Sequence, residues 1–291
     1  MISAMHARLF FYAVLTWAVV GCTPPIGQDS QLTRSEYFEV DSLRDDSVDS
    51  VIQRMQSERA LFVFDIDNTL LQYPQGRFVG SDQWYRWQRQ LEESASAKID
   101  CVLDFQGVAY YISHLLPTDN GYSTSLIQNL QQSGHDVIAL TARTPEFRAA
   151  TERELQRNNF DFRPSVPKGH NGFPGVYLPR ESDGIRIPRP ASYQNGIAML
   201  AGQHKGDALL DLLARLDATE EYDFVIFFDD APDNTSAMIE TFNGTSTTAI
   251  VFHFTGVNID LAQYDLEEAE RIQDKMLSAF ADFERSPECD I

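Results

Sequence analysis

Short apolar runs separated by amphipathic segments form the main pattern of the chain. Four such runs lie at 61–64, 136–140, 224–228 and 249–254. Nearly continuous apolar runs of this length are typical of strands that are buried on both faces of a sheet. Segments with helical periodicity lie at 41–60, 82–97, 104–116, 123–133, 145–158, 205–216, 231–242 and 266–283. We therefore predict an α/β fold in which helices flank both faces of a mostly parallel sheet.

The spacing of the predicted strands leaves room for two insertions. About 70 residues separate Leu71 from Leu140, which is more than one strand–helix–strand unit needs. We expect a helical cap over about 72–120. A stretch rich in Gly and Pro, with short strand candidates at 175–178 and 184–187, predicts a smaller, hairpin-bearing insertion over about 163–198.

The N-terminal segment has the pattern of an export signal. Residues 9–20 are apolar, a stretch too short for a permanent membrane span. The following Gly21-Cys22 resembles the lipobox of bacterial lipoproteins, which implies a signal peptide over 1–21, lipidation at Cys22 and a flexible tether over 22–40. The protein would then be exported and anchored by lipid on the periplasmic side, and Thr23 slightly favours the outer membrane. An ordinary secretory leader with an incidental cysteine is the alternative.

Composition narrows the class of partners. The chain has 291 residues, with 43 acidic and 23 basic side chains and a formal charge of −20. This charge repels nucleic acid and anionic lipid, so we expect no nucleic-acid partner and membrane contact only through the N-terminal anchor. Three cysteines exclude a disulfide-dense scaffold. Cys101 and Cys289 could pair in an oxidising periplasm, or both could remain unpaired.

Polar residues follow three of the predicted strands. Asp65 and Asp67 follow the first strand, Thr141 ends the second, and Asp229 and Asp230 end the third. The carboxyl ends of parallel strands meet at one edge of a sheet, where ligands bind in folds of this kind. Carboxylates that lie close together repel, and a hard divalent cation such as Mg²⁺ removes that cost.

A lysine and a hydroxyl complete the candidate chemistry. Lys205 begins a predicted helix, and with Thr141 it would supply the fixed cation and hydroxyl donor that a phosphoryl group needs. A carboxylate nucleophile such as Asp65, a second carboxyl for proton transfer and a metal together describe phosphoryl transfer through an aspartyl-phosphate.

At these residues the sequence resembles the haloacid dehalogenase (HAD) superfamily. The four segments that resemble its four motifs, in order, are 62–70, 138–143, 202–206 and 227–234. The resemblance implies a Rossmann-like core. It also implies that Asp65 is the nucleophile, that Asp67 protonates the leaving oxygen and then activates water, and that Thr141 and Lys205 hold the phosphoryl group.

The resemblance also implies a metal site for Mg²⁺. Asp65 and the backbone carbonyl of Asp67 would contact the metal, Asp230 would be the direct ligand from the fourth motif, and Asp229 or Asp233 would act through water. Because the choice between Asp229 and Asp230 stays open, both are candidate ligands.

The acid at position 67 narrows the activity that the resemblance implies. P-type ATPases carry Thr at this position and dehalogenases lack the equivalent acid, so Asp67 favours a phosphatase or phosphomutase. Export favours the phosphatase, acting on a small phosphorylated substrate under the cap. The chain resembles lipid-anchored bacterial HAD acid phosphatases, although Asp65-Ile66-Asp67-Asn68-Thr69 departs from their DLDET-type motif, and it also resembles an uncharacterised bacterial HAD branch. A non-catalytic lipoprotein that binds a phosphorylated ligand or a partner, and a phosphotransferase, are the alternatives.

Two further groups of side chains have open roles. Trp84 and Trp87 could pack in a core or face the substrate. Candidates for extra contacts to phosphate or carboxylate are Arg77, Arg86, Arg89 and Arg143.

Overall fold

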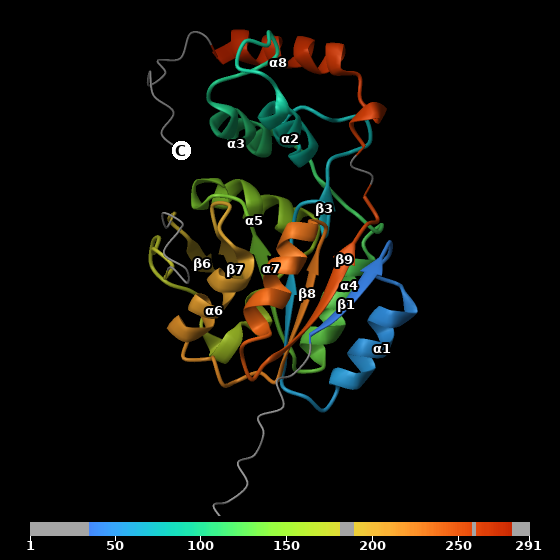
Figure 1. Cartoon of the computed structure of the whole chain (residues 1–291), viewed down its shortest axis with the longest axis vertical. Helices are drawn as coiled ribbons and strands as arrows, with labels where there is room; N and C mark the ends of the chain where they lie inside the picture. Colours follow the sequence, from blue (N-terminus) through green and yellow to red (C-terminus); the bar gives the residue numbers. More distant parts are fainter. Residues whose placement is uncertain (1–34, 181–188, 258–259, 281–291) are drawn as a thin grey trace, which may run out of the picture. The chain divides into compact units, whose positions relative to one another are not determined.

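A seven-stranded sheet forms the centre of the molecule (Figure 1). The computed structural model describes residues 35–180, 189–257 and 260–280. In spatial order the strands are β1 (Glu36–Val40), β9 (Thr248–Phe254), β8 (Phe224–Asp229), β2 (Ala60–Phe64), β5 (Asp136–Thr141), β7 (Ile197–Met199) and β6 (Ser192–Gln194). All neighbours pair in parallel except β6 and β7. The predicted α/β fold with a mostly parallel sheet is confirmed.

Helices cover both faces of this sheet because its central strands are apolar on both sides. All five residues of β2 are buried. Phe62 and Phe64 face one core, while Leu61 and Val63 face a second. The first core is closed by α1 (Asp46–Met55), α4 (Tyr122–Gln132) and α5 (Arg148–Arg157), and the second by α6 (Lys205–Arg215) and α7 (Pro232–Phe242). Short 3₁₀ turns lie at η1 (Pro145–Phe147), η2 (Arg163–Ser165), η3 (Pro167–Gly169) and η4 (Leu261–Gln263).

Three helices from two distant parts of the chain pack together beyond one end of the sheet. We call α2 (Asp82–Gln90), α3 (Val102–Ile112) and α8 (Leu266–Phe280) the cap (Figure 1). The first two lie between the short strands β3 (Leu71–Gln72) and β4 (Leu116–Pro117), which pair antiparallel. The cap has its own apolar core, and α8 contributes Ala269 to it. The cap therefore consists of the insertion expected at about 72–120 together with the C-terminal helix α8.

A buried amide joins the two parts of the cap. Gln273 of α8 accepts hydrogen bonds from Trp84 Nε1 at 3.2 Å and Gln88 Nε2 at 3.0 Å, and it donates to the carbonyl of Ala97 at 2.9 Å. Trp84 is fully buried and Trp87 nearly so. Both tryptophans pack in the core of the cap, and neither lines the cavity described below.

Two parts of the chain differ from the prediction. Residues 36–40, for which we expected part of a flexible tether, form the edge strand β1. Parallel pairing with β9 stabilises this strand, although its sequence is short and charged. The expected hairpin exists, but it is formed by β6 and β7, and β7 extends the main sheet by pairing with β5. The strand candidate at 175–178 forms no strand and makes only an isolated bridge between Tyr177 and Ala191, while 184–187 lies outside the described residues.

The N-terminal predictions lie outside the described residues. This holds for the signal peptide at 1–21, for Cys22 and for most of the tether. Cys101 is disulfide-bonded, and Cys289 lies outside the described residues. No helix in the described part of the chain combines the length and apolarity that a membrane span requires.

Candidate functional site

The three central strands deliver their polar ends to one edge of the sheet. Asp229 is the last residue of β8 and Thr141 the last of β5, while Asp65 follows β2 directly. The amide of Asp65 donates to the carbonyl of Phe228 at 2.9 Å, which continues the pairing of β2 with β8 past the end of the strand. The structure therefore brings residues from distant parts of the chain to the place that the sequence predicts.

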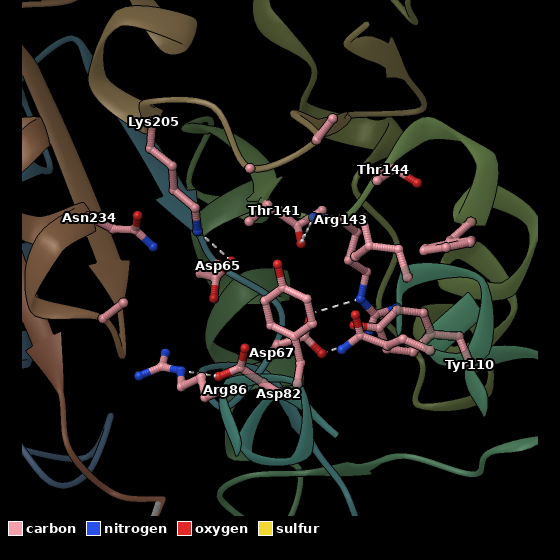
Figure 2. A pocket seen from close by; sticks show the side chains of 18 of the residues that line it. Asp65, Asp67, Asp82, Arg86, Tyr110, Thr141, Arg143, Thr144, Lys205 and Asn234 are labelled. Atoms are coloured by element: carbon pink, nitrogen blue, oxygen red, sulfur yellow. Dashed lines mark hydrogen bonds and ion pairs between the residues drawn. The ribbon is translucent and has the colours of Figure 1, made fainter. Parts of the chain in front are cut away.

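Lys205 lies between two buried carboxylates at this edge. It is the first residue of α6, and its Nζ donates to Asp65 Oδ1 at 2.5 Å (Figure 2). The same Nζ donates to Asp229 Oδ2 at 2.6 Å. Its side chain is 1% exposed. Burial alone would lower the pKa of Lys205, but the charges of Asp229 and Asp65 outweigh burial and raise it. Lys205 is therefore a fixed cation that offsets part of the charge of both aspartates.

Asp229 is surrounded by hydrogen-bond donors. Its Oδ1 accepts from the amide of Ala231 at 2.9 Å and from Asn234 Nδ2 at 2.9 Å, and its Oδ2 accepts from Lys205. Its side chain is fully buried. Asn234, on the first turn of α7, therefore helps to hold Asp229 in place.

Asp230 has a different environment from Asp229. Its Oδ2 accepts from Asn68 Nδ2 at 3.2 Å and lies 3.9 Å from Nη2 of Arg86 on α2. Burial, followed by the charges of Asp229 and Asp82, raises the pKa of Asp230 to about 7. Asp230 therefore lies where the sheet, the loop after β2 and the cap meet.

Three of these carboxylates could hold a cation together. Asp65, Asp229 and Asp230 are all at least mostly buried, and one carboxylate oxygen of each lies within 4.8 Å of the others. Burial raises the pKa of Asp65, and the charge of Asp229 adds to this effect, while Lys205 opposes it. A group of hard anionic oxygens that Lys205 neutralises only in part fits Mg²⁺.

Asp67 lies outside this group of carboxylates. Arg143 Nε donates to Asp67 Oδ2 at 2.8 Å and Arg143 Nη2 donates to Oδ1 at 2.7 Å, so both carboxylate oxygens of Asp67 are occupied. The arginine is buried, and its guanidinium lies 4.1 Å from the ring centroid of Tyr110 (Figure 2). Its Nη1 donates to Thr151 Oγ1 at 3.0 Å. The predicted contact of the Asp67 backbone carbonyl with a metal stays a prediction.

A cavity of about 190 Å³ opens onto these side chains, between the sheet edge and the cap. From the sheet side it is lined by Asp65, Asp67, Thr141, Ala142, Arg143, Thr144, Phe147, Arg189, Ala201, Gly202, Lys205, Asp230, Ala231 and Asn234. From the cap it is lined by Asp82, Tyr85, Arg86, Leu103, Gln106 and Tyr110. Of the four arginines suggested by the sequence, Arg86 and Arg143 line the cavity, and Arg77 and Arg89 do not. Asp233, suggested as a metal contact, does not belong to the carboxylate group.

Sequence reasoning missed several lining or supporting residues. Asn68 adopts a left-handed backbone conformation (φ 60°), donates to Asp230 and accepts from Gln83 of the cap at 3.1 Å. Its place in the first motif was a usable signal, because asparagine tolerates this conformation better than most residues. Asp82 and Arg189 gave no local signal, since only tertiary packing brings them to the cavity.

A protein-family model covers most of the chain. The model of the family described as "Protein of unknown function (DUF2608)" matches residues 43–285. The chain belongs to this family. A search of curated proteins found no match.

Two solved structures of a class C acid phosphatase from Bacillus anthracis, one with tungstate bound, also match this DUF2608 protein. Each is 14% identical over 83% of this chain and 86% of the other, with TM-scores of 0.34 for the tungstate complex and 0.35 for the second structure. Similarity at this level gives no information about chemistry.

Proposed function

We propose that the protein is a Mg²⁺-dependent phosphomonoester hydrolase of the HAD type that acts through an aspartyl-phosphate. The observation that carries this proposal is the position of Asp65, a carboxylate at a strand end that lines the cavity beside Lys205. Lys205 donates a hydrogen bond to Asp65 Oδ1. No side chain among the described residues donates one to Asp65 Oδ2. Asp65 therefore keeps one oxygen for attack on phosphorus.

Two steps would complete the reaction. In the first, Asp65 attacks phosphorus, the bond to the leaving oxygen breaks, and Asp67 gives that oxygen a proton. In the second, water attacks phosphorus and gives its proton to Asp67, and the bond between Asp65 and phosphorus breaks to release phosphate. Thr141 and Lys205 would hold the transferring group through a hydroxyl and an ammonium.

Asp65, Asp229 and Asp230 would hold the Mg²⁺ ion. When bound, Mg²⁺ would supply positive charge to offset the negative charge of the phosphoryl group and of the three carboxylates. Asp230 and Asp65 are the favoured direct ligands, because both oxygens of Asp229 already accept hydrogen bonds from Ala231, Asn234 and Lys205.

The experiment that tests this function is hydrolysis of an aryl phosphate with Mg²⁺. Asp65→Asn, which keeps size and removes the nucleophilic charge, should abolish turnover, and EDTA should suppress turnover by the unmodified protein. The matched control is Asp233→Asn, which changes an aspartate on α7 that does not line the cavity. Equal activity in Asp65→Asn would refute the proposal.

One observation favours the alternative of a non-catalytic phospho-ligand-binding protein. Arg143 occupies both oxygens of Asp67, so Asp67 must leave Arg143 before it can pass a proton to a leaving group. A binding protein needs no such release. A broad panel of phosphoesters with no turnover, alongside calorimetric binding of at least one of them, would select this alternative. A phosphotransferase would show transfer products when acceptor alcohols are added.

We also propose that the protein is exported and lipid-anchored through Cys22. The support is the sequence of residues 1–22 alone. Labelling with palmitate in a bacterial host should mark the natural protein and not Cys22→Ser.

A further inference from the structure

One lining cation of the cavity has no carboxylate partner among the residues that the structure describes. Lys205, Arg143 and Arg86 each form an ion pair with an aspartate of the site. Arg189 also lines the cavity, yet it makes no ion pair with a carboxylate in the described part of the chain. The chain has 43 acidic and 23 basic residues, so an arginine that lines the cavity without a carboxylate partner among the described residues is a candidate for binding an anion.

The guanidinium of Arg189 is held in place by the loop that leads into Lys205. Its Nη1 donates to the carbonyl of Ala201 at 3.1 Å, and its own carbonyl accepts from Gln203 Nε2 at 2.6 Å. Gly202 provides room for this contact, because a Cβ at Gly202 would lie 3.3 Å from Nη1. A guanidinium fixed through one nitrogen still has donors left for a ligand.

A buried hydroxyl on the same wall is also unused. Thr144 lines the cavity and is 7% exposed, and its Oγ1 has no hydrogen-bond partner among the described residues. Thr144 stands at the N-cap position of η1, where a threonine hydroxyl ordinarily caps the helix, but it makes no such bond. This oxygen has almost no accessible surface, so it reaches the cavity only when the side chain rotates about its Cα–Cβ bond. A buried hydroxyl without a partner costs free energy, and rotation toward a ligand oxygen would remove that cost.

Backbone hydrogen bonds connect the loop that holds Arg189 to the segment that carries Thr144. Ala201 donates to the carbonyl of Arg143 at 3.1 Å, and Gly202 donates to the carbonyl of Ala142 at 2.8 Å. The loop that holds Arg189 is therefore hydrogen-bonded to the segment that ends at Thr144. Asp65, Thr141 and Lys205 also line the cavity, and we assign them to the reacting phosphate.

We propose that Arg189 and Thr144 form a second anion subsite, so that the substrate is a phosphomonoester that carries another anionic group, either a carboxylate or a second phosphate. The proposal rests on the proposed function for the position of the reacting phosphate. The guanidinium recognises the charge of the second group, and the Thr144 hydroxyl, after rotation toward the cavity, donates to one of its oxygens.

Three probes of equal chain length test this subsite. They are propyl phosphate, 3-(phosphonooxy)propanoate and propane-1,3-diol bisphosphate, which differ only in a neutral, carboxylate or phosphate end group. The full chain should prefer at least one anionic probe over propyl phosphate in kcat/KM. Arg189→Gln should lower that preference about tenfold or more, mainly through KM, and Thr144→Val should lower it severalfold.

The control variant is Arg77→Gln, which removes one exposed positive charge away from the cavity. It tests whether the change in net charge alone weakens anion binding, and it should leave the preference unchanged. Arg189→Lys keeps the charge and loses the planar guanidinium, so it should recover part of the preference.

Binding to Asp65→Asn, measured by calorimetry with Mg²⁺, separates the two proposals. If no probe is turned over but the anionic probes bind more tightly and Arg189→Gln removes the difference, the hydrolase proposal fails and the subsite stands. If propyl phosphate is turned over or bound as well as both anionic probes, or if Arg189→Gln affects all three equally, the subsite is refuted.

Discussion

Removal of Lys205 tests whether the site is held together by charge. Its Nζ lies 2.5 Å from Asp65 Oδ1 and 2.6 Å from Asp229 Oδ2, and its side chain is 1% exposed. Lys205→Met keeps much of the apolar stem and leaves two buried carboxylates without their cation. Breaking a buried ion pair costs about 3–5 kcal/mol of unfolding free energy, chiefly because the remaining charge is uncompensated. For a domain of this size that corresponds to a fall in Tm of roughly 6–20 °C.

The assay is chemical and thermal unfolding without added metal, followed by repetition with Mg²⁺. The matched control is Lys168→Met, because Lys168 pairs with Asp217 and Glu221 at the surface and its loss should cost about 1 kcal/mol or less. Adding Asp229→Asn to Lys205→Met should restore part of the stability, because it removes one uncompensated charge. Mg²⁺ should restore part of it as well.

Two results would refute this reasoning. One is a loss in Lys205→Met no larger than in Lys168→Met. The other is a further loss of stability, rather than a partial recovery, when Asp229→Asn is added.

Three further perturbations test the metal site, the cap and the start of α6. The pKa of Asp230 is raised by burial and by its neighbours to about 7, above its unfolded value of 3.8, so the metal-free protein should lose stability as pH rises from about 4 to 7. Mg²⁺ should therefore raise Tm more at pH 8 than at pH 5, and a shift independent of pH would contradict this. Gln273→Leu leaves the buried Trp84 indole without an acceptor and should cost about 1–3 kcal/mol in urea unfolding, whereas a neutral effect would show that α8 is not fixed to the cap. Gly206→Ala places a Cβ 2.3 Å from a side-chain oxygen of α7 and should displace the start of α6 with Lys205, lowering kcat and stability together; unchanged kinetics would argue against this close approach.

The sheet and its site edge could be predicted because their signals are local. The buried strands β2, β5 and β8 appear in the sequence as apolar runs, and the polar residues that end them are adjacent in sequence to those runs. In contrast, β1 is short, charged and only partly buried, so its existence depends on pairing with β9, more than 200 residues later. The local pattern of apolar and polar residues does not indicate a pairing between such distant segments.

The cap and its contribution to the site could be predicted only in outline. The length between strands indicates an insertion, but it does not indicate that α8 completes the cap through Gln273. Similarly, the first motif identifies Asp67 without revealing its bidentate contact with Arg143. Arg143 lies two residues after Thr141, and its direction depends on packing against Tyr110 of the cap.

The central claim is that Asp65 forms a covalent bond to phosphorus. The most direct measurement is acid quenching of the protein during turnover of an aryl phosphate with Mg²⁺, followed by peptide mass spectrometry. We expect one added phosphoryl group on the peptide that contains Asp65, lost on treatment with hydroxylamine and absent in Asp65→Asn. Steady turnover with no phosphoryl group on that peptide, or undiminished turnover by Asp65→Asn, would contradict it.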